Sequence, residues 1–172
     1  MQSDHRQPSN TQPPNMSKGV WIIVWIVILL LFVKFFEGQL GNRDKIVQHN
    51  KGPGEVVLKR SRNGHYFANG FINQSPVTFL LDTGATSVAI PKKVADRLGL
   101  RRGYQHYANT ANGQSVAYQT KLESLSFGNI YLYDVDASIV EGFEGNEILL
   151  GMSALKHLEF TQKGNELTLK QL

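Results

Sequence analysis

The sequence predicts a mainly β domain of the size of a small barrel, preceded by one apolar helix that spans a membrane. Three observations support this prediction. The chain has 172 residues, enough for one domain with its own core plus an appendage. From residue 55 onward, short strand-like runs alternate with turns. Every residue from 20 to 33 is apolar.

The composition excludes several classes of function. The chain has no cysteine, so it has no disulfide framework, thiolate zinc site or cysteine nucleophile. The net charge of +4 is mild and its basic residues are scattered, which favours an ordinary solvated surface over a nucleic-acid or lipid-binding patch. No histidine pair has the i, i+4 spacing of a helical metal site, and serine-hydrolase, phosphate-loop and dinucleotide motifs are absent from the sequence.

The chain divides into four predicted segments. Residues 1–19 are rich in Gln, Asn, Ser and Pro, which predicts a disordered tail. Residues 20–36 form the predicted transmembrane anchor, with Lys34 near one end where its ammonium group can reach the interface. Residues 37–54 mix charges and glycines and are interpreted as a tether. Residues 55–172 form the folded domain.

A cleaved signal peptide and a buried core helix are the alternatives to an anchor. No convincing cleavage site follows the apolar run, and Trp21 and Trp25 suit a membrane interface, so an uncleaved anchor is favoured. The orientation stays open, because basic residues precede and follow the span alike: Arg6 and Lys18 before it, Lys34, Arg43 and Lys45 after it.

Turn residues separate the predicted strands, which are expected at residues 55–59, 66–72, 77–81, 115–127, 131–140, 148–150 and 167–169. Asn112-Gly113 and Gly164-Asn165 are the sharpest turn signals. One short helix is expected to open at Pro91 and close at Gly99, and a second to follow Gly151 as far as His157.

Two stretches, residues 77–100 and 135–158, share the order strand, turn and short helix. In this comparison Leu149-Leu150-Gly151 takes the place of Leu81-Asp82-Thr83-Gly84. An internal twofold plan and a chance likeness both explain the pattern.

The candidate catalytic motif is Phe79-Leu80-Leu81-Asp82-Thr83-Gly84-Ala85-Thr86. An apolar strand leads directly into an acid, a hydroxyl residue and a glycine, which places a carboxylate at the end of a buried strand. Gly84 allows another backbone or a substrate to approach closely. The alternative is that Asp82 only forms a turn after the strand, a common role for Asp near Gly.

This motif, a later hairpin tipped by Ala111-Asn112-Gly113, and Ile148-Leu149-Leu150-Gly151 before a short helix resemble the retropepsin-like aspartic peptidases in order and spacing. The similarity is strongest to the bacterial membrane-anchored group, in which an N-terminal span precedes one such domain. It covers residues from about 64 to the C-terminus. It implies a closed β-barrel of the acid protease fold with one or two short helices.

The resemblance also implies roles for the residues of the motif. Asp82 is the expected catalytic acid, and the Thr83 hydroxyl is expected to join a network that locks two active-site loops together. Gly84 and Ala85 are expected to line the substrate groove, and Thr86 to hydrogen-bond near the carboxylate.

Two further segments receive roles from the same resemblance. Residues 107–118 are the expected flap over a bound peptide, with Ala111, Asn112 and Gly113 at or near its tip contacting substrate. Leu149-Leu150-Gly151 is expected to pack beneath the active-site loop.

One chain encodes only half of a catalytic pair, because none of its other aspartates is followed by Ser/Thr-Gly: Asp4, Asp44, Asp96, Asp134 and Asp136. A twofold homodimer is expected to supply the second carboxyl group. Two adjacent carboxyls share one proton and can activate a water against a peptide carbonyl without metal or cofactor.

The expected function is therefore a membrane-anchored aspartic endopeptidase with a protein or peptide substrate. By resemblance it belongs to the bacterial inner membrane, with its catalytic domain in the periplasm. The alternative is a non-proteolytic dimerisation or protein-binding module of the same fold. The intact Asp82-Thr83-Gly84 favours the peptidase.

Overall fold

The computed structural model describes residues 18–40, 46–110 and 113–172, and the side chains within these ranges from residue 21 to 34 and from residue 46 onward. The chain separates into two compact units, Met1–Arg43 and Asp44–Leu172. The predicted disordered tail lies almost wholly outside the described residues.

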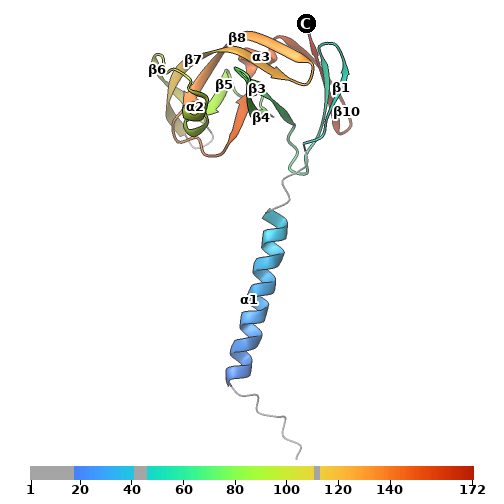
Figure 1. The fold of residues 1–172 in the computed structure, drawn as a ribbon, viewed down its shortest axis with the longest axis vertical. Helices are drawn as coiled ribbons and strands as arrows, with labels where there is room; N and C mark the ends of the chain where they lie inside the picture. Colours follow the sequence, from blue (N-terminus) through green and yellow to red (C-terminus); the bar gives the residue numbers. More distant parts are fainter. Residues whose placement is uncertain (1–17, 41–45, 111–112) are drawn as a thin grey trace, which may run out of the picture. The chain divides into compact units, whose positions relative to one another are not determined.

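The described part of the first unit is a helix, α1, over Lys18–Leu40 (Figure 1). The apolar side chains from Trp21 to Val33 are exposed. In the described part of the chain, no helix combines the length and the apolar character required to cross a membrane.

The second unit is built around a closed β-barrel, as the sequence predicted (Figure 1). The strands follow the order β3-β4-β9-β5-β8-β7, and pairing of β3 with β7 closes the ring. Strand β6 extends the sheet beyond β7. The seven strands are β3 (Phe67–Ile72), β4 (Ser75–Leu81), β5 (Val88–Pro91), β6 (Gln105–Thr110), β7 (Gly113–Phe127), β8 (Ile130–Val140) and β9 (Glu147–Leu150).

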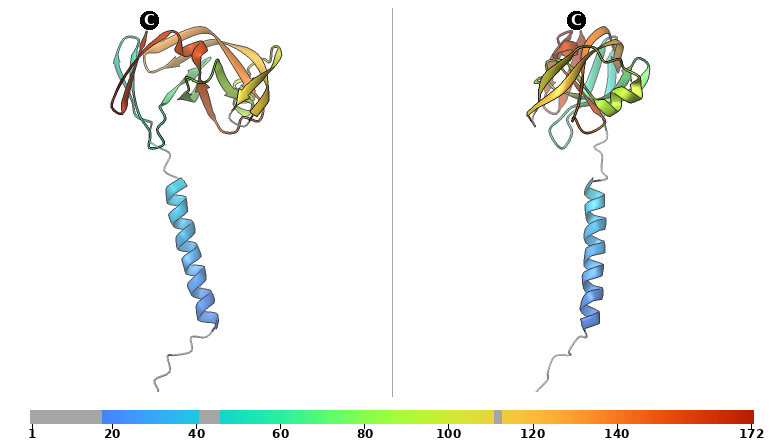
Figure 2. Two further views of the ribbon diagram at one scale, coloured as in Figure 1. Left: turned by 180° about the vertical axis from the view of Figure 1, so that it is seen from behind. Right: turned by 90° about the vertical axis from the view of Figure 1, so that its left-hand side faces the viewer.

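A second sheet is formed by the first two and the last two strands of this unit. Its four antiparallel strands have the order β1-β2-β11-β10. They are β1 (Gln48–Gly52), β2 (Glu55–Lys59), β10 (Leu158–Lys163) and β11 (Glu166–Gln171). This terminal sheet and strand β6 lie at opposite ends of the unit (Figures 1 and 2).

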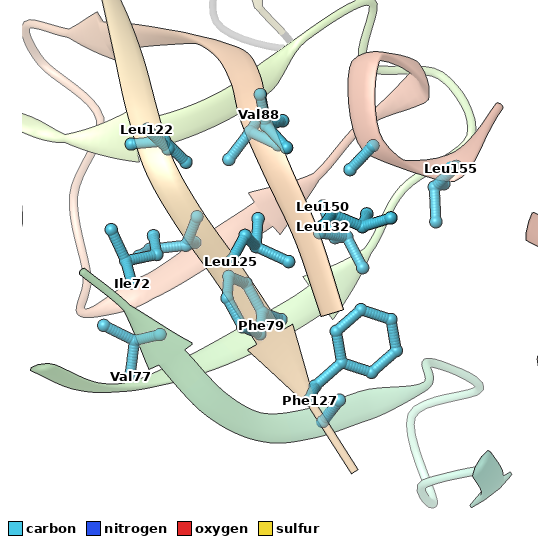
Figure 3. Packing of buried hydrophobic residues seen from close by; sticks show 14 of the residues in the cluster. Ile72, Val77, Phe79, Val88, Leu122, Leu125, Phe127, Leu132, Leu150 and Leu155 are labelled. Atoms are coloured by element: carbon cyan, nitrogen blue, oxygen red, sulfur yellow. The ribbon is translucent and has the colours of Figure 1, made fainter. Parts of the chain in front are cut away.

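Aromatic packing fills the barrel where β3 and β7 meet. Phe79 and Phe127 are fully buried and pack edge to face, with ring centroids 6.0 Å apart (Figure 3). Gly70 is required at this closure, because a Cβ there would collide with the Ser126 carbonyl oxygen and lie 2.8 Å from the Phe79 ring. A larger residue at this position would force β3 and β7 apart.

Both predicted helices are present. Helix α2 (Lys92–Leu98) begins after Pro91 and ends at Gly99, whose φ of 65° is the left-handed conformation that glycine adopts easily. Helix α3 (Met152–Leu155) follows Gly151 but stops before His157. Lys156 still has helical backbone angles, and the His157 N–H bonds to Ala154 O.

The structure corrects the boundary between tether and domain. The predicted tether, residues 37–54, contains the end of α1 and all of β1. Strand β1 belongs to the folded unit because its residues pair with β2 and because the Asn69 N–H donates to Gln48 Oε1 at 3.0 Å. A strand composed of polar residues gives no alternating hydrophobic signal, which explains why the sequence did not predict it.

The strand pairing shows an internal twofold arrangement, but the structure pairs the two halves differently from the sequence prediction. Strand β4 pairs in parallel with β9, and β8 pairs in parallel with β5. Ala89 of β5 lies opposite Leu149 of β9, so these two strands are the equivalent elements. The counterpart of the loop at residues 82–87 is therefore the loop at residues 141–146, and not Leu149-Leu150-Gly151.

Candidate active site

Asp82 is the first residue of the loop that connects β4 to β5. Its N–H donates to the Leu150 carbonyl oxygen on β9 at 3.2 Å, and the Leu81 N–H donates to Tyr66 O at 3.0 Å. Two neighbouring segments therefore hold the backbone where the carboxylate emerges. Asp82 is half-buried, so its carboxyl group reaches solvent at the end of a strand that buries Val77 and Phe79 in the core.

The loop orients the carboxylate with its own backbone. The Gly84 N–H donates to Asp82 Oδ1 at 2.9 Å, and the Ala85 N–H donates to Asp82 O at 3.2 Å. This is the local turn that Asp favours, and it fixes one carboxylate oxygen without a second side chain. Thr83, Gly84 and Thr86 are exposed, and Ala85 is partly buried.

The segment around Gly151 supports the loop from beneath, as predicted. The Met152 N–H donates to Ala85 O at 2.8 Å, and the Ser153 N–H donates to Thr86 O at 3.0 Å. A Cβ at Gly151 would collide with the carbonyl oxygen of Ser87 and lie 2.7 Å from that of Ala85. Only glycine allows the two backbones to approach this closely.

Ser153 is a supporting residue that the sequence did not reveal. Its hydroxyl donates to the Asp136 carbonyl oxygen at 2.7 Å and accepts from the Val88 N–H at 3.0 Å. One side chain thus links α3 to β8 and to the first residue after the active-site loop. Its partners lie 17 and 65 residues away in the chain, and no local sequence pattern reports such contacts.

The predicted flap is a hairpin formed by β6 and β7. Residues from Gln105 to Thr110 pair with residues from Gly113 to Tyr118. The Thr110 hydroxyl donates to Gly113 O at 2.8 Å, and Gly113 has a φ of 101°, which only glycine adopts readily. Ala111 and Asn112, the other predicted tip residues, lie outside the described residues.

A chain of polar side chains joins the active-site loop to this hairpin, and the sequence did not predict it either. The hydroxyl oxygens of Ser87 and Ser138 are 3.0 Å apart, and Ser138 Oγ lies 3.3 Å from His106 Nε2. Ser138 is buried on β8 and His106 belongs to β6. The flap strand and the loop that carries Asp82 are therefore coupled through β8.

Arg102, one of the scattered basic residues, makes ionic and aromatic contacts within the fold. Its guanidinium contacts Glu141 at 3.2 Å and Asp96 at 3.5 Å. It also stacks over Tyr118, 5.0 Å from the ring centroid. These contacts tie α2 and the loop after β8 to the base of the hairpin, which is an ordinary structural role.

Within the described residues, no cluster of three or more His, Asp or Glu side chains is arranged to hold a metal ion. The described hydrogen bonds of Asp82 run to Leu150, Gly84 and Ala85. The arrangement presents one oriented carboxylate per chain, on a loop whose next two residues are exposed.

Comparison with known proteins assigns this site to a family. The model of the family described as gag-polyprotein putative aspartyl protease matches residues 68–157, which include the Asp82 loop, the β6–β7 hairpin and Gly151. The chain belongs to this aspartyl protease family.

A solved structure supports the assignment at the level of the fold. The retropepsin-like aspartic protease from Rickettsia conorii superimposes with a TM-score of 0.58 at 29% identity. The match covers 67% of this chain and 98% of that protein.

Two curated relatives are similar over most of this chain. An uncharacterized protein from the region 5′ of cobV in a Sinorhizobium species is 28% identical over 88% of this chain and 71% of its own length. An uncharacterized protein from Rickettsia prowazekii is 27% identical over 82% of this chain and 64% of its own length. The present chain is thus similar to about two thirds of each relative.

Gly151→Ala is expected to displace the Asp82 loop of the present protein. The added methyl group overlaps two backbone carbonyl oxygens that cannot move independently of the loop. We expect the free energy of unfolding to fall by about 2–3 kcal/mol, measured by urea denaturation.

Gly52→Ala is the matched control, because an added Cβ there lies 3.9 Å from the flexible Glu55 carboxylate. This variant should stay within about 0.5 kcal/mol of the natural chain. Equal stability of the Gly151→Ala variant and the natural chain would contradict the proposed packing.

Proposed function

We propose that this protein is an aspartic endopeptidase that becomes active when two copies bring their Asp82 carboxyl groups together. The observation that carries the proposal is the single Asp82-Thr83-Gly84 loop, held at a strand end by backbone bonds to β9. Family membership over residues 68–157 supports it. So does the 29% identity to a protein described as a retropepsin-like aspartic protease.

The proposed chemistry follows from the proximity of two carboxyl groups. They cannot both ionise cheaply, so they hold one shared proton and titrate as a coupled pair. The charged member takes a proton from a water molecule, whose oxygen attacks the scissile carbonyl carbon, while the neutral member protonates the carbonyl oxygen. In the second step the neutral carboxyl group protonates the departing amine nitrogen as the C–N bond breaks, and the ionised carboxylate takes the proton from one hydroxyl of the intermediate, which becomes the carbonyl of the acid product and restores the shared proton. Neither a metal nor a cofactor takes part.

The neighbours of Asp82 have positions compatible with the roles proposed for them. The exposed Thr83 side chain is available to bond the equivalent loop of a second copy. Gly84 and Ala85 offer small surfaces to a substrate backbone, and the exposed Thr86 lies at the outer end of the same turn.

The β6–β7 hairpin is proposed to close over the peptide. Small residues at Ala111, Asn112 and Gly113 would allow backbone contact with substrate, and closure would exclude bulk water from the reacting groups. The polar contacts that link Ser87, Ser138 and His106 would hold the base of the hairpin in a fixed position relative to the Asp82 loop.

A non-proteolytic dimerisation or protein-binding module is the second candidate. It would retain the barrel and the terminal sheet but would have no use for an oriented carboxylate at a strand end. Binding of a transition-state mimic of peptide hydrolysis such as pepstatin, with loss of that binding in Asp82→Asn, would distinguish the peptidase from the binding module.

We further propose that residues 20–36 anchor the protein in the bacterial inner membrane with the barrel in the periplasm. Support comes from the unbroken apolar run at residues 20–33 and from its helical conformation within α1. Exposed apolar side chains surround this helix, as expected for a helix that contacts lipid. Trp21 and Trp25 suit the interface at one end.

Asp82→Asn is expected to abolish peptide cleavage, because the amide can neither share nor transfer the proton. The rate should fall by at least about a thousandfold, measured on a quenched fluorescent peptide library. Asp134→Asn is the control, since Asp134 is exposed on β8 in a conformation that Asn tolerates, with φ at 54°. Cleavage at the natural rate by the Asp82→Asn variant would remove the assignment.

The anchor and its orientation can be tested with single cysteines, because the natural chain has none. Lys170→Cys on the exposed side of β11 should react with a membrane-impermeant maleimide in cells whose outer membrane is permeabilised. Ser3→Cys should react only after the inner membrane is broken. The reverse pattern would contradict the orientation, and release of the chain by alkaline carbonate would contradict the anchor.

A further inference from the structure

The outer face of the barrel wall, opposite the core, carries Asp82. Val77 and Phe79 of β4 are buried in the core. Alternation along the strand therefore places Leu80 and Asp82 on the outer face. Leu80 lies beside Leu149 of β9, and both leucines are half-buried and do not belong to the hydrophobic core. Two large apolar side chains next to the candidate catalytic acid are thus available to contact a substrate.

Strand register extends this outer face from β4 to β8. Ala89 of β5 lies opposite Leu149, and Ser138 of β8 lies beside Ala89. Paired residues project from the same face of a sheet. One row therefore crosses four neighbouring strands: Leu80, Leu149, Ala89 and Ser138. At about 4.8 Å per strand, this row spans at most about 14 Å.

The hairpin formed by β6 and β7 continues the same face. Val140 of β8 lies opposite Ala117 of β7, and Ala117 lies opposite His106 of β6. Because Val140 is two residues from Ser138, His106 projects from the face that carries Ser138. The 3.3 Å between Ser138 Oγ and His106 Nε2 agrees with this placement. Ala108, two residues farther along β6, lies on the same face toward the hairpin tip.

Small side chains line this face between the Asp82 loop and the hairpin. Ser115 lies opposite Ala108, and Ser87 is two residues before Ala89. All four residues are half-buried. Their side chains project little beyond the backbone, so a peptide bound across Asp82 can extend a long side chain over them.

Hydrogen-bonding groups lie on the same part of the face. Ser138, only 8% exposed, contacts Ser87 on one side and His106 on the other. The half-buried Ser87 hydroxyl can form a further bond, as donor or as acceptor according to the direction of the chain. A substrate group that approaches this chain therefore meets Ser87.

The chemistry of the chain favours an amide over a charged group. A carboxamide has both a donor and an acceptor, so it fits either direction of the hydroxyl chain. A carboxylate only accepts and an ammonium only donates, so each fits one direction. A carboxylate would also lie near the negative charge of the proposed carboxyl pair, which raises the cost of ionisation.

We propose that Ser87 binds the side-chain amide of a substrate glutamine that lies two to four residues from the cleaved bond. Ser138 and His106 are positioning residues that hold the Ser87 hydroxyl. The row of at most about 14 Å matches about four residues of an extended peptide, at about 3.4 Å per residue. This inference rests on the proposed function, because it requires a peptide bound across Asp82.

Peptides that differ at one position test the preference. Gln, Met or Glu is placed at the second, third or fourth position on either side of the cleaved bond, and kcat/KM is measured with the natural chain. At one or more of these positions, Gln should exceed Met, which has a similar length, by about tenfold. Glu should be cleaved more slowly than Gln. Equal rates for Gln and Met at all of these positions, or faster cleavage of Glu, would overturn the inference.

Variants of the hydroxyl chain test the assigned residues. The readout is the ratio of kcat/KM for the Gln peptide to that for the Met peptide, because general damage to packing lowers both rates together. Ser87→Ala and Ser138→Ala should bring this ratio close to one, whereas Ser87→Thr keeps the hydroxyl and should keep the preference. Ser126→Ala, which removes a hydroxyl elsewhere on β7, is the control. A natural ratio in Ser87→Ala would overturn the assignment.

Binding to an inactive chain separates this inference from the proposed function. Full-length Asp82→Asn should bind fluorescent octapeptides with Gln about tenfold more tightly than those with Met, and the added Ser87→Ala change should remove the difference. That result, together with no cleavage by the natural chain, would overturn the peptidase and support the inference. Cleavage by the natural chain with equal binding of both peptides would overturn the inference alone.

Discussion

The contact between the active-site loop and the β9–α3 segment is the constraint on which the site depends. The Asp82 N–H bonds to Leu150 O, and the N–H groups of Met152 and Ser153 bond to Ala85 O and Thr86 O. Both ends of the loop are therefore held by one segment. The contact exists because Gly151 has no side chain to separate the two backbones.

The barrel brings these segments together through its internal twofold arrangement. Strands β5 and β9 pair with each other in the sheet, and each is followed by a short helix. The duplication extends to two equivalent six-residue loops, at residues 82–87 and 141–146. Only the first contains the Asp-Thr-Gly triplet. The architecture is doubled within the chain, whereas the Asp-Thr-Gly triplet is not.

Sequence patterns predicted the elements whose signals are local. Strand β2 was predicted with its exact bounds, and β3 and β7 within two residues, because apolar residues alternate or cluster along them. Strands β1, β5, β6 and β10 were not among the strands expected from the sequence pattern, although most of β6 lies in the first arm of the expected flap. Strands β1, β6 and β10 consist mainly of polar residues, and β5 has only four residues.

For the site, the sequence located Asp82 and the segment beneath it, because both consist of contiguous motifs. It did not predict Ser153 or the chain of Ser87, Ser138 and His106, whose partners are 17 to 65 residues apart. Side chains meet across such separations only after the barrel closes. The roles of Thr83, Gly84, Ala85 and Thr86 toward substrate stay predictions.

The central claim is that each active site contains one Asp82 from each of two copies. It is tested most directly by mixing natural and Asp82→Asn chains at constant total concentration and measuring peptide cleavage. If both carboxyl groups are needed and the chains pair at random, an equal mixture keeps about one quarter of the natural activity. Retention of about one half would show that each chain acts alone, and would contradict the account.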